Sequence, residues 1–253
     1  MLYMDERHGL RFPTANPSVG VPVLHVVSLN CAGGSTSAAQ EALARFSGSA
    51  DIILLQEIPP PDQIKALQDA SNSGYNFLTG MDTAVLARGN VEAVPLDEHD
   101  ALYFVVARIQ FPEDSSLYAV SLRLIPPLTR IDLFNPECWR AYRKDFRRRR
   151  EQMERVVQVL KTLPPDTPVL VGGDFNAPAG DGILRPLTSL GLEDSFPRAG
   201  QGWGNTIIND VPFHRIDQIW VRPEHLRPLQ VRAVKTVYSD HRMVQASFLL
   251  PAN

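Results

Sequence analysis

The sequence predicts an α/β protein in which two β-sheets pack face to face and helices cover their outer sides. Strand-like apolar runs occur in both halves of the chain, and segments with helical periodicity lie between several of them. A chain of 253 residues with 44% hydrophobic residues can also bury a large core. We therefore expect one domain over residues 23–250, preceded by an arm at residues 1–22.

The elements are predicted in chain order from these patterns. Strands are expected at residues 23–29, 52–55, 75–78, 84–87, 101–111, 117–124, 169–171, 215–221 and 244–250. Helices are expected to begin near Ser37, Asp62, Asn135 and Ile183. Because residues 75–124 show only strand patterns, they are predicted to form a meander with a hairpin loop at residues 112–116.

Local capping signals place the helix ends. Ser37 and Gln40 resemble a capping box, and Asp62 is predicted to cap the second helix. Asn135 precedes a proline and an acid, which is typical of the start of a helix. Pro164–Pro165 then ends that long helix, because proline cannot continue the hydrogen-bond ladder.

One basic segment contrasts with an acidic chain. Residues 137–155 carry a net charge of +4, which leaves −7 for the rest of a chain whose total is −3. The run Arg147–Arg150 points all around a helix, so a solvated surface is its simpler interpretation. The residues that do share one face are Arg140, Arg143, Lys144 and Arg147. We hypothesise that this stripe attracts a polyanion, either nucleic acid or an anionic membrane surface.

The stretch from Pro168 to Pro178 is central to the functional interpretation. Three apolar residues at 169–171 predict a strand buried on both faces, and the two glycines after them are expected to allow a sharp turn. Asp174 and Asn176 then lie on one side of the chain at the carboxyl end of a strand, where α/β proteins place ligands. The alternative is an Asx-turn, in which both side chains only bond their own backbone.

Five further polar residues also lie at or near predicted strand ends. The full set is Asn30, Glu57, Asp174, Asn176, Asp217, Asp240 and His241. Two like charges about 4 Å apart repel by roughly 4 kcal/mol at an effective dielectric near 20, so converging acids need a compensating cation. Oxygen ligands without a thiolate cluster or paired histidines favour Mg²⁺ or Mn²⁺ over zinc.

Five short motifs in this set resemble those of the endonuclease/exonuclease/phosphatase superfamily in order and approximate spacing. They are Leu29–Asn30, Leu55–Glu57, Gly173–Asn176, Arg215–Asp217 and Ser239–His241. The resemblance extends from about Val23 to Leu250. It implies the deoxyribonuclease I-like fold, a four-layer sandwich of two mixed sheets flanked by helices, with the site at one sheet edge.

The resemblance also implies roles for individual residues. Glu57 would be the principal metal ligand, with Asn30 beside it and Asp240 in the metal's shell. Asp174 would orient and help to deprotonate the attacking water. Asn176 would hold that water or the phosphate. His241 would bond a phosphate oxygen, and Asp217 would hold the imidazole of His241.

Arg123 departs from the family pattern. Many members carry a histidine in the corresponding strand, where this chain reads Val120-Ser-Leu-Arg123-Leu124. An arginine cannot donate a proton at neutral pH, but it can bond a phosphate through two N–H groups. We hypothesise that Arg123 contacts the phosphate and that metal-bound water protonates the leaving group. The alternative is an outward-facing strand arginine.

Together these patterns predict a Mg²⁺- or Mn²⁺-dependent hydrolase of phosphoesters, and the first choice among these is a phosphodiesterase acting on nucleic acid. A phosphatase or phospholipase-C-like enzyme is the alternative within the enzyme class, and a non-catalytic phosphate-binding module is the alternative outside it. No stretch is apolar for long enough to cross a membrane. With only Cys31 and Cys138, no disulfide framework is needed, so we expect a cytoplasmic, monomeric protein.

Overall fold

The computed structural model describes residues 22–45, 50–71, 74–112, 115–127, 132 and 134–250. The predicted arm lies outside the described residues except for Pro22. Within the part of the chain that is described, no helix combines the length and the apolar character needed to cross a membrane.

Twelve strands of the described chain form two mixed sheets of six strands each. The first sheet has the order β11 (Arg227–Val234), β12 (Met243–Leu249), β1 (Val23–Asn30), β2 (Ile52–Gln56), β4 (Thr83–Ala87) and β3 (Asn76–Thr79). The second has the order β5 (Asn90–Ala93), β6 (Phe104–Gln110), β7 (Ser116–Arg123), β8 (Val169–Asp174), β10 (Asp217–Val221) and β9 (Glu193–Asp194). Among these twelve strands, only the β1–β2 and β7–β8 pairs are parallel.

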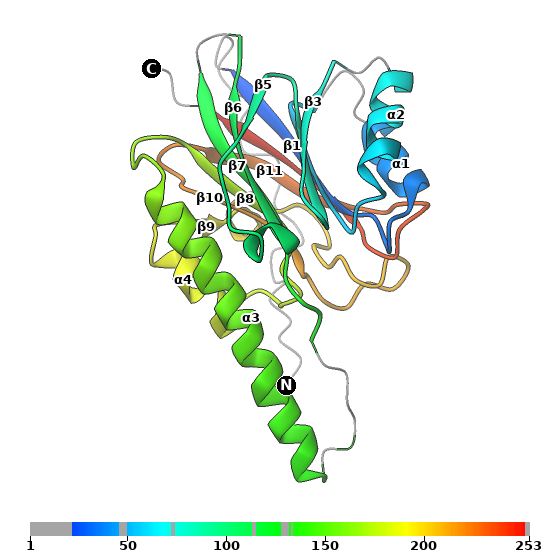
Figure 1. The fold of residues 1–253 in the computed structure, drawn as a ribbon, viewed down its shortest axis with the longest axis vertical. Coiled ribbons are helices and arrows are strands. Elements are labelled where there is room, and N and C mark those ends of the chain that lie inside the picture. Colours follow the sequence, from blue (N-terminus) through cyan, green and yellow to red (C-terminus); the bar gives the residue numbers. More distant parts are fainter. Residues whose placement is uncertain are drawn as a thin grey trace.

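Helices cover the outer face of each sheet (Figure 1). They are α1 (Thr36–Arg45), α2 (Pro61–Ser71), α3 (Pro136–Thr162) and α4 (Arg185–Thr188), with short 3-10 turns at Asp100–Leu102 and Gly182–Leu184. The short helix α5 (Ser195–Ala199) instead contacts β10 and β11, one strand from each sheet. One core cluster joins the first sheet to α1 and α2, a second joins the other sheet to α3 and α4, and a third lies between the sheets. The predicted four-layer sandwich is therefore confirmed.

The predicted strands all overlap strands of the structure, but their grouping into sheets and their number differ from the prediction. The predicted meander over residues 75–124 is wrong, because β3 and β4 belong to one sheet whereas β5, β6 and β7 belong to the other. The predicted strand at residues 101–111 begins only at Phe104, since residues 100–102 form a 3-10 turn. Strands β5, β9 and β11 were not predicted. Strands β5 and β9 have only four and two residues, and β11 begins with Arg227–Pro228 and has an irregular register between Pro228 and Gln230.

Two helix starts also differ from prediction. Helix α1 begins at Thr36, and Ser35 rather than Ser37 provides the cap, since its Oγ accepts a bond from Ala38 N at 3.2 Å. Helix α2 begins at Pro61, which places Asp62 in the first turn and not at the cap. The start of α3 was predicted correctly, with Asn135 Oδ1 accepting from Glu137 N at 2.9 Å.

The two glycines of the central stretch do not form a turn. Gly172 and Gly173 lie inside β8, paired with both β7 and β10. They serve close approach instead: a Cβ on Gly173 would meet Leu122 O at 2.0 Å, and Gly173 also has a φ of +144°. A Cβ on Gly172 would clash only with a side-chain atom, Leu54 Cδ1 of the facing sheet at 2.5 Å, since the next atom, Ile219 Cγ1, lies at 3.4 Å.

We expect Gly173→Ala to lower the free energy of unfolding by about 2–4 kcal/mol, because it combines a backbone clash with a φ that side chains rarely adopt. Gly172→Ala is the matched control. Its clash is with the end of a flexible side chain, so a loss of about 1–2 kcal/mol is expected. Urea denaturation of both variants measures the difference, and equal losses would contradict the proposed backbone contact.

Candidate active site at the sheet edge

Strand direction brings the predicted site residues to one edge of the two sheets. Because β1 runs parallel to β2 and β7 parallel to β8, the carboxyl ends of these four strands meet there. Antiparallel partners contribute their starts at the same edge. The residues placed in this way are Asn30, Glu57, Asp82, Arg123, Asp174, Asp217 and His241.

Asp174 is the centre of the hydrogen-bond network. Its Oδ2 accepts from Asn30 Nδ2 and from Asn176 Nδ2, both at 3.0 Å, and its Oδ1 accepts from Asn176 N at 2.9 Å. The last bond is the Asx-turn that the sequence allowed, so that alternative is correct as local geometry. It does not exhaust the role of Asp174, because Asn30 lies 144 positions away in the chain and in the facing sheet.

Glu57 adopts an unusual backbone conformation directly after β2. Its φ is +46°, in the left-handed region that costs a side-chain-bearing residue about 1–2 kcal/mol. Three contacts hold it there: Gly34 N donates to its carbonyl at 3.0 Å, Gly33 N donates to Oε2 at 2.5 Å, and Asn30 Nδ2 donates to Oε1 at 3.1 Å. Strained residues held by several contacts cluster at functional sites.

Partial burial by itself raises the pKa of the Glu57 carboxyl. The hydrogen bond from Asn30 and the charge of Arg123 act in the opposite direction and prevail, so the pKa lies below its ordinary value. Glu57 is therefore an anion at neutral pH.

His241 and Asp217 form a buried pair. His241 Nδ1 lies 2.8 Å from Asp217 Oδ2, and both side chains are less than one-tenth exposed. Burial alone would lower the pKa of the imidazole, but the Asp217 carboxylate outweighs burial and raises that pKa to about 9. His241 is consequently protonated at neutral pH.

Two hydroxyl groups that sequence reasoning missed position this pair. Ser239 Oγ accepts from His241 N at 3.0 Å and donates to Asn30 O at 2.7 Å, which ties the histidine loop to the end of β1. Thr206 Oγ1 accepts from Asp217 N at 3.1 Å. Ser239 stands within a recognised motif and could have been suspected, whereas no local pattern distinguishes Thr206.

The buried carboxyl groups of Asp174 and Asp217 lie close enough together to favour the binding of a positive charge. Ligand atoms of Asp174, Asp217 and His241 all lie within 4.8 Å of one another. Burial, and then the negative charge of Asp217, raise the pKa of Asp174 to about 7. Asp217 Oδ1 is buried and accepts no hydrogen bond from the described residues.

Arg123 is partly exposed and is paired with two acids of the site. Its Nη2 lies 2.8 Å from Glu57 Oε1 and its Nη1 lies 2.9 Å from Asp82 Oδ2. The outward-facing alternative is therefore wrong, because the guanidinium bridges two acids at the site. Asp82 was not predicted, since it precedes β4 in a loop whose sequence carries no motif.

The arginine run of α3 also contributes to the site. Arg149 is buried and its Nη1 donates to Asn176 O at 3.1 Å, while Arg147, Arg148 and Arg150 are exposed. The solvated interpretation of the run is thus wrong for one of its four members. A helix turns about 100° per residue, so four consecutive positions must include one that faces inward.

Asp240 differs from the other predicted ligands because it is exposed. Its carbonyl oxygen accepts from Asn209 N at 2.7 Å, and its negative charge contributes to the raised pKa of His241. The structure thus places Asp240 beside His241 but on the solvent side of the buried cluster.

Comparison with known proteins agrees with this geometry. The model of the Endonuclease/Exonuclease/phosphatase family matches residues 27–241, which span every motif named above. The chain belongs to this family.

Family relatives are distant in sequence. The uncharacterized protein YbhP of Escherichia coli K12 is 25% identical over 185 residues, which cover 69% of this chain and 72% of YbhP. An endonuclease/exonuclease/phosphatase family protein from Bacteroides thetaiotaomicron superposes with a TM-score of 0.69 at 19% identity, covering 92% of this chain and all of that one. D. rerio TDP2 complexed with a single-strand DNA product gives a TM-score of 0.61 at 20% identity, covering 89% and 98%. The two structures establish a shared fold.

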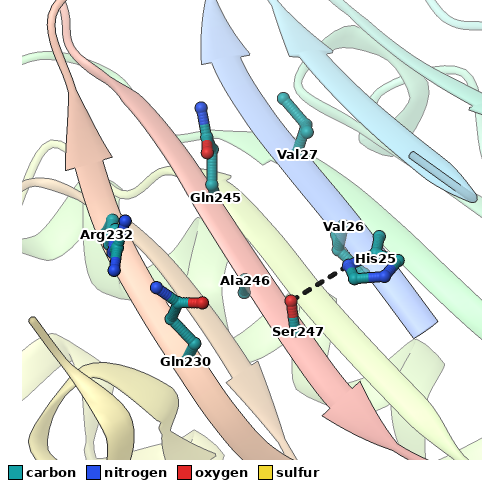
Figure 2. Close-up of a pocket in the computed structure, with 8 residues that line it drawn as sticks. All are labelled: His25, Val26, Val27, Gln230, Arg232, Gln245, Ala246 and Ser247. Carbon is teal, nitrogen blue, oxygen red and sulfur yellow. Dashed lines mark hydrogen bonds between the residues drawn. The ribbon is translucent and has the colours of Figure 1, made fainter. Parts of the chain in front are cut away.

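Two other polar groupings lie away from the family's sheet edge. One is a hollow of about 240 Å³ on the outer face of the first sheet, where His25 Nδ1 lies 3.0 Å from Ser247 Oγ (Figure 2). Asp97, His99 and Asp100 also gather within ligand distance of one another, but Arg155 lies 3.3 Å from both acids and offsets their charge. Neither has the buried, unbalanced acids of the sheet edge.

Proposed function

We propose that the chain is a divalent-metal-dependent phosphodiesterase that hydrolyses its substrate with a water held by Asp174. The observation that carries this proposal is that the buried Asp174 carboxyl group and the buried His241 imidazole lie together at one edge of the sheets. A buried acid with a pKa of about 7 faces a buried imidazole with a pKa of about 9. Groups whose pKa values are moved in this way suit a base and a cationic donor at neutral pH.

The donor set suits a Mg²⁺ or Mn²⁺ ion. Glu57 is an anion at the edge, and Asp217 Oδ1 is a buried acceptor without a partner among the described residues. Glu57, Asn30 and Asp240 are proposed to hold the ion, as the family resemblance implies. When bound, the ion would neutralise phosphate charge and help to generate the nucleophile.

The chain's own residues supply the remaining chemistry. Asp174 would accept a proton from the attacking water, and the Asn176 amide would hold that water or the phosphate. The His241 imidazolium would donate from Nε2 to a non-bridging phosphate oxygen, while Asp217 fixes the ring through Nδ1. Such a fixed donor stabilises the charge that develops on the phosphoryl oxygens.

Arg123 is proposed to serve the same phosphate. Because it already bridges Glu57 and Asp82, its guanidinium is held in place before substrate arrives. It would bond an incoming phosphate oxygen, in keeping with the absence of the histidine that many family members carry in this strand.

We expect hydrolysis of a chromogenic phosphodiester to require Mg²⁺ or Mn²⁺ and to stop on addition of a chelator. Restoring the ion after dialysis should recover the activity, and Glu57→Gln should raise the ion concentration needed for half-maximal rate by about tenfold or more. Turnover that is insensitive to the chelator would refute metal dependence. No turnover under any condition would favour the non-catalytic phosphate-binding module.

The substrate class is proposed separately from the chemistry. Nucleic acid is one candidate, because the structure of D. rerio TDP2 with a single-strand DNA product has the same fold. A second candidate, a phospholipase-C-like activity on lipid phosphoesters, is favoured by exposed apolar side chains beside His241, among them Val237 and Tyr238. Parallel assays on DNA, RNA, phosphomonoesters and phospholipids distinguish these candidates.

A further inference from the structure

Large apolar side chains are exposed on two adjoining loops of this molecule. In the described chain they are Trp203, Ile208, Val211, Phe213, Val237 and Tyr238, of which Val211 is 77% exposed and Val237 70% exposed. Single exposed apolar residues are ordinary, but a group of six on neighbouring loops marks an interaction surface. We call this group the apolar loops.

The apolar loops adjoin the candidate active site. Asn209 links them, because its Nδ2 donates to Thr236 O at 2.8 Å and to Ser239 O at 3.1 Å. Ile207 forms a β-bridge with His241. Backbone bonds from Val237 N and Tyr238 N to Glu41 Oε2, at 2.9 and 3.2 Å, fix the second loop to α1. The apolar side chains are therefore displayed on an ordered frame next to the catalytic histidine.

Helix α3 carries positive charge and also projects from this end of the molecule (Figure 1). It passes the site where Arg149 contacts Asn176, and its first 13 residues continue about 20 Å further at 1.5 Å per residue. Figure 1 shows that half of α3 projecting beyond the edge of the sheets where the loops around residues 200–215 also lie. A hollow on the projecting half is lined by Arg140, Arg143, Lys144, Arg147 and Arg148 with a single acid, Glu151.

Aromatic residues border that basic face. Trp139 is 50% exposed and Phe146 is 39% exposed. At 100° per residue they lie on the flank next to Arg143, so the helix offers aromatic and basic side chains together. An amphipathic surface of this kind is typical of helices that lie in the interface of an anionic bilayer.

We propose that the catalytic edge is a docking face for an anionic phospholipid bilayer, with the apolar loops entering the headgroup region and the α3 basic face contacting the headgroups. The aliphatic Ile208, Val211 and Val237 favour a bilayer over nucleic acid, because bases stack on aromatic rings whereas aliphatic side chains gain free energy by entering an apolar layer. The acidic remainder of the chain would be repelled by the same surface, which orients the protein with its site toward the lipid. If the proposed function is correct, the substrate is a lipid phosphodiester presented at the surface of the bilayer.

The experiment measures sedimentation of the full chain with vesicles of phosphatidylcholine alone and of equal parts phosphatidylcholine and phosphatidylglycerol. We expect binding to the mixed vesicles that weakens as salt is raised. The double variant Val211→Glu/Val237→Glu should lower the partition coefficient about tenfold or more, because it removes apolar insertion and adds two repelled charges. Its turnover of a soluble chromogenic phosphodiester should not change.

Arg227→Glu is the matched control, because it changes the net charge by the same amount at the opposite end of the first sheet, where Arg227 pairs with Leu249. It should bind mixed vesicles within about twofold of the original chain. Equal binding of the double variant, or no vesicle binding at low salt, would overturn the proposal. A third result would also overturn it. If the original chain bound a single-stranded oligonucleotide tightly but did not bind vesicles, and the double variant lost the oligonucleotide, the surface would serve nucleic acid.

Asp174→Asn separates this proposal from the proposed function. The inactive variant should still bind mixed vesicles as the original chain does. If the original chain binds vesicles but hydrolyses no phosphodiester, the docking face stands and the phosphodiesterase proposal fails. If it hydrolyses phosphodiesters but does not bind vesicles, the phosphodiesterase proposal stands and the docking face fails.

Discussion

Replacing Asp174 with asparagine should reduce the turnover number on a phosphodiester by about 10²–10⁴-fold, the range expected when a positioned base is removed. The substitution preserves shape, and the new amide oxygen can still accept from Asn30 or Asn176. It also removes a buried charge whose pKa is raised by burial and by Asp217. Because the new NH2 group must face one of the N–H donors that Asp174 now accepts from, the free energy of unfolding should fall by no more than about 1–3 kcal/mol. Steady-state kinetics and urea denaturation measure the two effects.

Asp166→Asn provides the control for this prediction. Asp166 lies in the exposed turn before β8, so the same chemical change there should leave turnover within about twofold. If Asp174→Asn kept more than a tenth of the original turnover while folding normally, Asp174 would not be the base.

Replacing His241 with glutamine should lower the turnover number by about 10²–10³-fold, because a cationic donor to the phosphate is lost from a buried position. Binding of substrate in the ground state should change less, so the Michaelis constant is expected to move by a smaller factor. His99→Gln is the control, since His99 is an exposed histidine outside the site. An equal loss in both variants would indicate a general effect on the fold.

The pH dependence of turnover should show an alkaline limb near the pKa of His241, which is about 9. The imidazolium is the active form, so the rate is expected to fall as pH rises through that value. Asp217→Asn removes the carboxylate that raises the pKa, and the limb should move toward 6.5, the ordinary value. The same raised pKa stabilises the fold fully below about pH 6.5, and that contribution is lost as pH rises through about 9. An alkaline limb that does not move in Asp217→Asn would assign it to another group.

Much of the fold could be predicted because its signals are local. The buried β2 and β8 were visible as continuous apolar runs, and the start of α3 was visible as Asn135 followed by proline. Strand β11 was not predicted although Leu229, Val231 and Ala233 alternate with polar residues, because Pro228 and the irregular register beside it interrupt the pattern where the strand pairs with β12. Local propensity is weak where a partner strand supplies the hydrogen bonds.

The candidate site divides in the same way. Motif order pointed to Glu57, Asp174 and His241, because each follows or adjoins a strand end in the chain. The partners of these residues remained hidden, since Thr206 and Asp82 stand in loops without a pattern.

By itself the sequence determined which chemical groups are available and at which strand ends they stand, because strand and helix periodicity is written in neighbouring residues. Only the tertiary structure decided how those groups meet. The bond from Asn30 to Asp174 joins two sheets, the left-handed backbone of Glu57 is held by Gly33 and Gly34, and Arg123 is engaged by two acids. The parallel pairing of β1 with β2 and of β7 with β8 sets these contacts, since it sends four strand ends to one edge.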